Sequence, residues 1–336
     1  MDGNVRPLVL VTHPRDRLAD YFGERALQQL GAAAQVRLNT LDADLAGPLL
    51  IDAALGCSAI IAYRQTALDA SVFGALPDLQ AVVRCAVDIR TIDVAAASAH
   101  GVLVTQASAG FMASVSEWIV GVMIDLSRHI TSAAASYRAG MDAQPRMGRE
   151  LRGATLGVIG YGQISRYLCP LAQALGMRVV VSDPHVQVGA SAIVQVGLPE
   201  LLAQADFVVC LAPANAATEN LLEDKAFASM KQGAYFINAA RGNLVDDAAL
   251  LRALDSGHLG GAALDVGRAA DQMPSPALAR HARVIATPHI GGLTPPAIEH
   301  QALESVAQAL EILRGRVPTG AVNAHAATRL RASARA

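Results

Sequence analysis

Short apolar runs alternate with longer amphipathic segments through about the first hundred residues. The runs PLVLVTH, AIIAY, LQAVVRCAV and GVLVT are separated by segments of helical spacing at 18–32 and 66–76. Apolar runs of this kind are typical of strands buried on both faces of a parallel sheet. The pattern predicts an α/β domain whose sheet is covered by helices on both sides.

A second series of strand-like runs begins at residue 155. It comprises TLGVIG, RVVVSD, DFVVCLA, AYFINA, GGAALDV and RVIATPH, with helical segments between them. Six such runs match a complete doubly wound nucleotide-binding domain. One long helix over 114–137, capped by Ser114 and Glu117, is expected to lead into it.

The last helix has its start marked by Pro295 and Pro296, and we expect it to pack back on the first domain. The first domain is then discontinuous, comprising 1–105 plus 291–325, with the nucleotide domain at 106–290 inserted into it. The crossovers near residues 105 and 290 would form a hinge. Residues 326–336 carry arginines without an apolar face and are predicted to be disordered.

Composition narrows the class of protein. The 336 residues include 52% hydrophobic and 17% charged residues, with a net charge of -2. This balance predicts a soluble, enzyme-like chain without a basic face for nucleic acid. No apolar run is long enough for a membrane helix and the start lacks a secretory signal, so we expect a cytoplasmic protein. The four cysteines are far apart and suit buried thiols; we expect no metal site.

The most informative segment is LGVIGYGQISRYLCPLAQALGMRVVVSD, residues 156–183. It has the order strand, glycine turn, helix, strand and acid that a dinucleotide-binding unit requires. Gly160 and Gly162 occupy the first two glycine positions, and Ser165 occupies the third. Asp183 lies 23 residues after Gly160 (183 minus 160), where a carboxylate would bind an adenosine ribose. Its charge would repel a 2′-phosphate, which favours NAD over NADP.

Two polar residues follow later strands, at the sheet edge where ligands bind in such folds. Arg241 comes after AYFIN, where a guanidinium is suited to bind a carboxylate and a carbonyl. His289 comes after RVIATP and before Gly291 and Gly292. Taken singly, a surface arginine and a solvated loop histidine are the commoner explanations.

Together these motifs resemble the D-isomer-specific 2-hydroxyacid dehydrogenases. The resemblance runs from about residue 55 to 325 and rests on the glycine turn, INAARGNLVDDAAL, GAALDV and TPHIGGLT in that order. It implies a Rossmann NAD-binding domain inserted into a flavodoxin-like substrate domain. It also implies a homodimer that pairs through the nucleotide domain and the long helix, where Trp118, Ile119, Val122 and Met123 could serve either the interface or the core.

The resemblance assigns roles by position. His289 would be the general acid and base that exchanges a proton with the substrate oxygen, and Arg241 would bind the carboxylate and polarise the carbonyl. Asp265 would contact the nicotinamide side of the cofactor, and Pro213 would line the cofactor cleft. The whole cofactor set is Gly160, Gly162, Gln163, Ile164, Asp183, Pro213, Ala240, Asp265 and Gly291; the substrate set is Arg64, Val87, Asp88 and Arg241.

Three departures from the family pattern are informative. Position 270 is alanine where relatives carry a glutamate that pairs with the histidine. Asp271 is the candidate replacement for that glutamate. If no acid replaced it, the pKa of His289 would be lower. AVDIRTID at 86–93 replaces a glycine-rich loop that holds the substrate carboxylate, so Asp88 could oppose an anion while Arg64 or Arg90 compensates. Phe111 stands where a small polar residue is common.

The sequence therefore predicts an NAD-dependent D-2-hydroxyacid dehydrogenase that acts mainly as a 2-keto acid reductase. The departures favour a substrate with an apolar side chain over phosphoglycerate. The alternative is an NAD(H)-responsive regulatory protein on the same scaffold, with little or no turnover. Neither hypothesis involves nucleic acid or a membrane as a partner.

Overall fold

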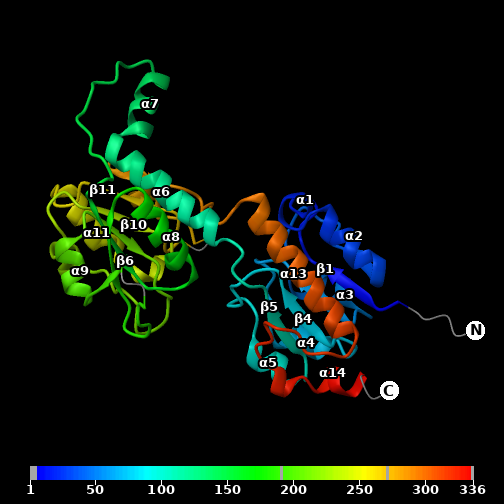
Figure 1. Ribbon diagram of the computed structural model, residues 1–336. Helices are drawn as coiled ribbons and strands as arrows, with labels where there is room; N and C mark the ends of the chain where they lie inside the picture. Colours follow the sequence, from blue (N-terminus) through cyan, green and yellow to red (C-terminus); the bar gives the residue numbers. More distant parts are fainter. Residues whose placement is uncertain (1–5, 190–191, 270–271, 334–336) are drawn as a thin grey trace, which may run out of the picture. The chain divides into compact units, whose positions relative to one another are not determined.

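The computed structural model describes residues 6–189, 192–269 and 272–333. The chain divides into two compact units, which we describe separately (Figure 1). Unit 1 comprises Met1–Gly110 and Pro295–Ala336, and unit 2 comprises Phe111–Thr294. The chain passes from one unit to the other a few residues after each of the two predicted crossovers.

Unit 1 contains a parallel five-stranded sheet in the order β2-β1-β3-β4-β5. Its strands are β1 Leu8–Val11, β2 Gln35–Leu38, β3 Ala59–Ala62, β4 Ala81–Arg84 and β5 Leu103–Gln106. This is the strand order of flavodoxin-like folds. The sequence pattern did not predict β2, because this edge strand, QVRL, has no buried residue and therefore no apolar run.

The helices of unit 1 cover both faces of that sheet. They are α1 Leu18–Tyr21, α2 Glu24–Ala33, α3 Gly47–Ala54, α4 Ala70–Ala75, α5 Val94–Ala99, α13 Pro295–Leu313 and α14 Thr328–Ser333, with a short turn η2 at Ala324–Ala326. Val9, Ile61 and Val83 face α2 and α13, whereas Leu10 and Ile60 face α3 and α4. Successive strand residues point to opposite faces, which explains why the central strands β1 and β3 are apolar throughout.

Two predictions for unit 1 need correction. The single helix expected over 18–32 is divided at Gly23, whose positive φ of 85° ends α1 and precedes α2. The disordered end predicted for residues 326–336 is wrong for the part that the structure describes. There the chain forms α14, and Leu330 is 1% exposed in the core of the unit.

Unit 2 contains a parallel seven-stranded sheet in the order β12-β11-β10-β9-β6-β7-β8. Its strands are β6 Thr155–Ile159, β7 Arg178–Ser182, β8 Val194–Gln195, β9 Phe207–Cys210, β10 Tyr235–Asn238, β11 Gly261–Leu264 and β12 Val284–Ala286. All six predicted runs form strands, and β8 is an additional strand with exposed residues. The order is that of a Rossmann sheet with one more strand at its edge.

The helices of unit 2 are α6 Met112–Arg128, α7 Ile130–Arg138, α8 Gln163–Ala174, α9 Leu198–Gln204, α10 Asp224–Ala228, α11 Asp247–Asp255 and α12 Pro276–Ala279, with η1 at Gly242–Leu244. The long helix expected over 114–137 is broken at His129, which adopts the left-handed conformation. Ser114 does not cap α6; its hydroxyl lies 2.7 Å from that of Thr294.

The expected interface residues of α6 are mostly part of the core. Ile119, Val122 and Met123 are buried against the sheet of unit 2, and Trp118 packs at the margin of the same cluster. In contrast, α7 has no buried residue and extends away from the sheet (Figure 1). No helix within the described ranges is long and apolar enough to span a membrane.

The strand order of unit 2 reverses between β6 and β9, which lie side by side; α8, after β6, packs on one face of the sheet, and α10, after β9, packs on the other. In open parallel sheets, ligands bind in the crevice at the carboxyl ends of the strands beside such a reversal. The loops that follow β6, β9, β10, β11 and β12 share this edge. Together with the loop after β7, which contains Asp183, they contain the candidate residues of unit 2.

Candidate active site

The turn after β6 has the geometry of a dinucleotide-binding turn. Gly160 has a φ of 91°, and a Cβ on it would lie 2.9 Å from the backbone N of Ala212. Glycine is therefore required both for the conformation and for the close approach to the loop after β9. Gly162 caps α8, and a Cβ there would meet nothing within 4 Å. The start of α8 thus offers backbone N–H groups to an anion, as a pyrophosphate requires.

The third position of the glycine fingerprint is occupied by a residue that strengthens the turn. Ser165 is fully buried, and its hydroxyl donates a hydrogen bond of 2.7 Å to the carbonyl of Gly160. The side chain therefore fits between the helix and the turn instead of forcing them apart. The sequence showed the departure from glycine but not this contact.

Asp183 directly follows β7, beside the same turn. Its carboxylate accepts hydrogen bonds from the backbone N–H groups of Tyr161 at 2.7 Å, His185 at 2.8 Å and Val186 at 3.0 Å. Burial acts to raise the pKa of Asp183, but these backbone donors outweigh it and leave the pKa below its usual value. Asp183 is thus held as an anion next to the glycine turn.

The other predicted cofactor residues lie along the same edge of the sheet. Gln163 and Ile164 open α8, Pro213 is exposed in the loop after β9, and Ala240 follows β10. The carbonyl of Pro213 accepts the hydroxyl of Thr218 at 2.7 Å, which shapes that loop. The structure therefore brings these four residues to the edge predicted for the cofactor.

Arg241 is held by the end of β10. The amide of Asn238, which is 1% exposed, donates to the carbonyl of Arg241 at 3.0 Å and accepts the N–H of Ala240 at 3.0 Å. Arg241 is half-buried, and its Nη1 donates to the carbonyl of Ala240 at 2.7 Å. The backbone from which the guanidinium projects is therefore fixed by a buried side chain.

His289 lies two strands away, in the turn after β12, and it adopts the left-handed conformation with a φ of 56°. Asp265, at the end of the intervening β11 and 4% exposed, organises this turn. Its carboxylate accepts hydrogen bonds from the Thr287 hydroxyl at 2.6 Å and from the N–H groups of Ile290 at 2.8 Å and Gly291 at 2.7 Å. Asp271, the predicted partner of His289, lies outside the described residues.

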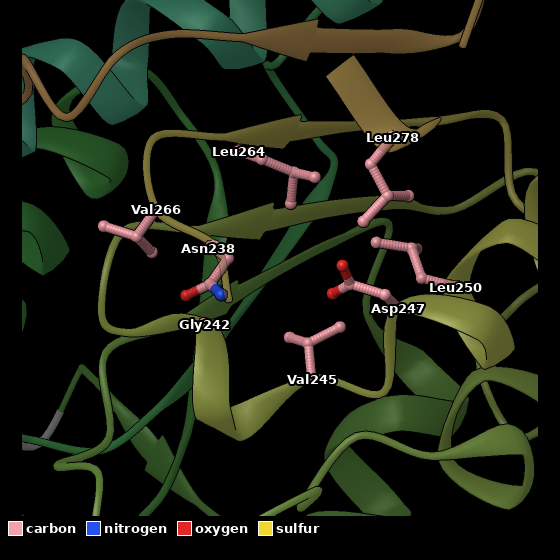
Figure 2. Close-up of a pocket in the computed structure, with 9 residues that line it drawn as sticks. Asn238, Gly242, Val245, Asp247, Leu250, Leu264, Val266 and Leu278 are labelled. Carbon is pink, nitrogen blue, oxygen red and sulfur yellow. The ribbon is translucent and has the colours of Figure 1, made fainter. Parts of the chain in front are cut away.

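A small pocket is lined by Asn238 and Gly242, on either side of Arg241 in the chain (Figure 2). Val245, Leu250, Leu264 and Leu278 make it largely apolar, while the carboxylate of Asp247 projects between them. Its volume of about 10 Å³ is close to that of a single water position. The pocket is therefore a packing feature beneath the site and has no room for a substrate.

The candidate residues of unit 1 follow β3 and β4, again at carboxyl ends. Arg64 comes after β3, and Val87 and Asp88 come after β4. The Asp88 carboxylate pairs with the guanidinium of Arg90 at 2.7 Å and also accepts the Arg90 backbone N–H at 3.0 Å. Arg90 therefore offsets the negative charge of Asp88, which reduces the predicted repulsion between Asp88 and an anionic substrate. The same pair engages the Arg90 side chain within its own loop.

Arg84 is a buried residue of this edge that the sequence analysis did not select. It is 0% exposed, and its guanidinium donates to the carbonyls of Tyr63 and Thr66 and to the hydroxyl of Thr91. Burial lowers its pKa to about 10 in spite of the nearby Asp88. The side chain of Arg84 therefore connects two loops. One is the turn that contains Arg64, and the other is the loop at 86–93 that replaces the family's glycine-rich segment. A charged residue ending the apolar run AVVR was the available signal.

A family model for the D-isomer specific 2-hydroxyacid dehydrogenase NAD binding domain matches residues 120–291. The matched span covers just over half of the 336 residues and falls within unit 2. The chain belongs to the D-isomer-specific 2-hydroxyacid dehydrogenase family. The expected cofactor, NAD, is confirmed by this match.

Similar proteins extend the match into unit 1. D-3-phosphoglycerate dehydrogenase from Rattus norvegicus is 38% identical over 277 residues, which are 81% of this chain and 52% of that protein. The chain thus spans about half the length of the curated relatives it matches. The structure of the TT0316 protein from Thermus thermophilus is 30% identical, with a TM-score of 0.83 and coverage of 94% of this chain and 99% of that one.

The fold is also shared with a structure of lower sequence identity. D-lactate dehydrogenase from Aquifex aeolicus, solved with NAD and lactic acid, is 24% identical, with a TM-score of 0.78 and coverage of 94% and 99% of the two chains. The predicted family and the two parallel-sheet folds are confirmed. In the family's NAD-binding unit, the glycine turn and Asp183 form a cradle whose residues fit the cofactor.

Proposed function

We propose that this protein is an NAD-dependent D-2-hydroxyacid dehydrogenase that acts mainly as a reductase of a small 2-keto acid. The observation that carries the proposal is the arrangement of Arg241 and His289 on loops after β10 and β12, with Asp265 between them holding the His289 turn. Both side chains share the sheet edge with the NAD turn. A guanidinium and an imidazole at that edge are the groups that ketoacid reduction requires.

In this proposal, Arg241 binds the substrate carboxylate and stabilises the negative charge that develops on the carbonyl oxygen. NADH supplies the hydride for the carbonyl carbon. His289 donates a proton to the carbonyl oxygen, so that the keto acid becomes a hydroxy acid, and accepts the proton in the reverse direction. Nδ1 of His289 is buried, which leaves Nε2 as the nitrogen that would exchange the proton.

We propose further that the substrate has an apolar side chain. Phe111 packs against Gly292, the third residue after His289, because a Cβ on Gly292 would lie 3.3 Å from the Cβ of Phe111. An aromatic ring there gives the neighbourhood of His289 an apolar wall. In unit 1, Arg64, Val87 and Asp88 would form the substrate set, with the charge of Asp88 offset by Arg90.

A homodimer is also proposed. The exposed α7 supports it, since Ile130 and Tyr137 are 52% and 66% exposed and Met141, just beyond the helix, is 59% exposed. Large apolar side chains gathered on a projecting segment are typical of subunit interfaces. We place the protein in the cytoplasm, which suits its four buried free thiols.

The test is NADH oxidation with a panel of 2-keto acids, including glyoxylate, pyruvate, phosphohydroxypyruvate and branched or aromatic keto acids. Phosphohydroxypyruvate belongs in the panel because the curated relatives are D-3-phosphoglycerate dehydrogenases. We expect the fastest turnover with an apolar keto acid, and its loss in Arg241→Ala and His289→Ala. Faster turnover of phosphohydroxypyruvate would contradict the substrate proposal. Tight NADH binding with no turnover on any member would favour the regulatory protein.

A further inference from the structure

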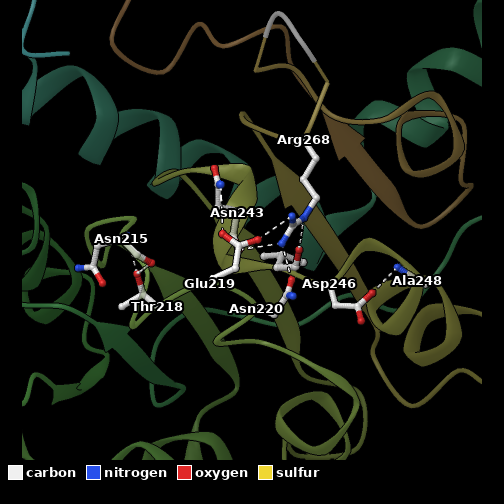
Figure 3. A network of polar contacts seen from close by, with 9 residues as sticks. Asn215, Thr218, Glu219, Asn220, Asn243, Asp246, Ala248 and Arg268 are labelled. Atoms are coloured by element: carbon white, nitrogen blue, oxygen red, sulfur yellow. Dashed lines mark hydrogen bonds and ion pairs between the residues drawn. The ribbon is translucent and has the colours of Figure 1, made fainter. Parts of the chain in front are cut away.

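We infer that Arg268 is a positioning residue that holds the Arg241 turn in place for the substrate carboxylate. The inference rests on the proposed function. Arg268 lies in the loop after β11 and reaches across the turn that follows Arg241 (Figure 3). It occurs in the segment DVGRAADQMP, where this chain departs from the family pattern.

Two hydrogen bonds link Arg268 directly to the Arg241 turn. Its Nε donates to the carbonyl of Val245 at 2.8 Å, and its Nη2 donates to the carbonyl of Asn243 at 2.8 Å. Both carbonyls belong to the short segment that contains η1. A single turn of this kind has few bonds of its own, so its position depends on contacts made from outside.

The backbones of the two loops are also in direct contact. A Cβ on Gly242 would lie 2.1 Å from the carbonyl carbon of Gly267 and 2.6 Å from the backbone N of Arg268. Gly242 is the residue immediately after Arg241. The two loops are therefore already in contact at Gly242. The guanidinium of Arg268 adds hydrogen bonds to the carbonyls of Asn243 and Val245, which this backbone contact does not hold.

Arg268 also connects the turn to a third loop, the one after β9. Nη1 pairs with Glu219 at 2.9 Å, and Nη2 donates to the side-chain oxygen of Asn220 as well. The hydrogen bond from Arg268 is the main cause of the lowered pKa of Glu219. The same loop bonds the turn directly, through Asn220 N–H to the carbonyl of Asn243 at 2.9 Å. One arginine thus joins the loops after three adjacent strands.

The chemistry of the contacts explains why an arginine is required. The acceptors lie in several directions around the guanidinium, and a planar group with five donors reaches them together. A lysine ammonium at this position would lie near only some of them. Lysine should therefore preserve part of the effect, while alanine should remove it.

Hydrogen exchange followed by mass spectrometry tests the link without using activity. In Arg268→Ala we expect faster exchange of the bonded N–H groups of Asn220, Leu222, Val245 and Asp246, with an intermediate change in Arg268→Lys. The matched control is Arg316→Ala, which removes a bidentate pair with Glu311 at 2.5 and 2.6 Å in unit 1 and should leave these exchange rates unchanged. Unchanged exchange in Arg268→Ala would overturn the inference.

Steady-state kinetics tests the consequence. We expect Arg268→Ala to raise KM for the preferred 2-keto acid by about tenfold, with the Kd for NADH almost unchanged and partial recovery in Arg268→Lys. An unchanged KM, or an equal loss of NADH affinity, would contradict the positioning role. If the wild-type protein reduces no keto acid, the proposed function fails, and hydrogen exchange alone decides whether Arg268 holds the turn.

Discussion

The carboxylate of Asp265 and the backbone of Gly291 fit closely together. Oδ2 accepts the Gly291 N–H at 2.7 Å, and a Cβ on Gly291 would lie 2.8 Å from the same oxygen. Gly291, the second residue after His289, is thus hydrogen-bonded to the buried carboxylate of Asp265, and this contact leaves no room for a side chain on Gly291. The placement of the His289 imidazole depends on this contact.

Gly291→Ala should therefore lower kcat for keto acid reduction by about tenfold or more, because the new methyl group displaces Asp265 and with it the His289 turn. The Kd for NADH should rise by a smaller factor: Gly291 and Asp265 belong to the proposed cofactor set, but the glycine turn and Asp183 follow β6 and β7 and keep their contacts. The measurements are steady-state kinetics and NADH titration. Gly121→Ala is the control, because a Cβ at that exposed helical position meets nothing within 4 Å. Equal kinetics in both variants would exclude the role given to this contact.

Ser165 provides a second test. Ser165→Ala removes the buried hydrogen bond to Gly160 and leaves the carbonyl without that donor, so we expect a loss of about 1 kcal/mol in the free energy of unfolding. NADH binding should weaken severalfold because the turn is less firmly held. Urea unfolding and NADH fluorescence titration measure the two effects.

The control for Ser165 is Ser229→Ala. Its hydroxyl also donates to a helical carbonyl at 2.7 Å, that of Lys225, but the residue is exposed. Water can replace that bond, so the variant should be nearly as stable as the wild type. If Ser165→Ala were equally neutral for stability and NADH affinity, the turn would not depend on the hydroxyl.

These contacts show where sequence reasoning reached its limit. Most strands of both cores were predictable because parallel strands buried on two faces are almost entirely apolar, as in β6 and β10. The strand β2 was not, since QVRL lies at an edge and has no apolar pattern. The break at His129 was also missed, because one left-handed residue leaves helical spacing on both sides almost unchanged.

The candidate site divides in the same way. Residues that directly follow strands, such as Arg241 and His289, could be identified because strand ends determine their place at the ligand edge. Residues that act by bonding another loop could not. Arg268 and Asn243 are 25 positions apart in the chain, and nothing in the spacing of either segment predicts that a guanidinium and a carbonyl meet there.

Asp183 should set the choice of cofactor. Asp183→Ser removes the anion beside the glycine turn, so the ratio of kcat/KM with NADPH to that with NADH should rise by about tenfold or more. Activity with NADH should fall, because three backbone N–H groups lose part of their acceptor. Steady-state kinetics with both cofactors measures the ratio.

Asp206→Asn is the matched control for Asp183. Asp206 also accepts a backbone N–H, that of Thr155 at 2.8 Å, but it precedes β9 and therefore lies at the opposite end of the strands. The variant should leave the cofactor ratio unchanged. A ratio that moves equally in both variants would mean that Asp183 acts through stability and not through charge.

His13 should make unit 1 sensitive to acid. It is 1% exposed between the rings of Phe22 and Tyr63, and burial lowers its pKa from 6.5 to about 3, against the opposing effect of a hydrogen bond to the Tyr21 backbone. The unfolded chain then binds a proton more readily than the folded one. Stability from this residue is complete above about pH 6.5 and declines as the pH falls towards 3.

His13→Asn removes this titration while keeping an amide donor, so its stability should fall less steeply than that of the wild type between pH 6.5 and 3. The difference should reach several kcal/mol at the acid end, because each unit of pKa shift corresponds to about 1.4 kcal/mol. Urea unfolding of both proteins at a series of pH values measures it. If the unfolding free energies of the wild type and His13→Asn changed in parallel with pH through this range, His13 would be protonated in the folded state as readily as in the unfolded chain.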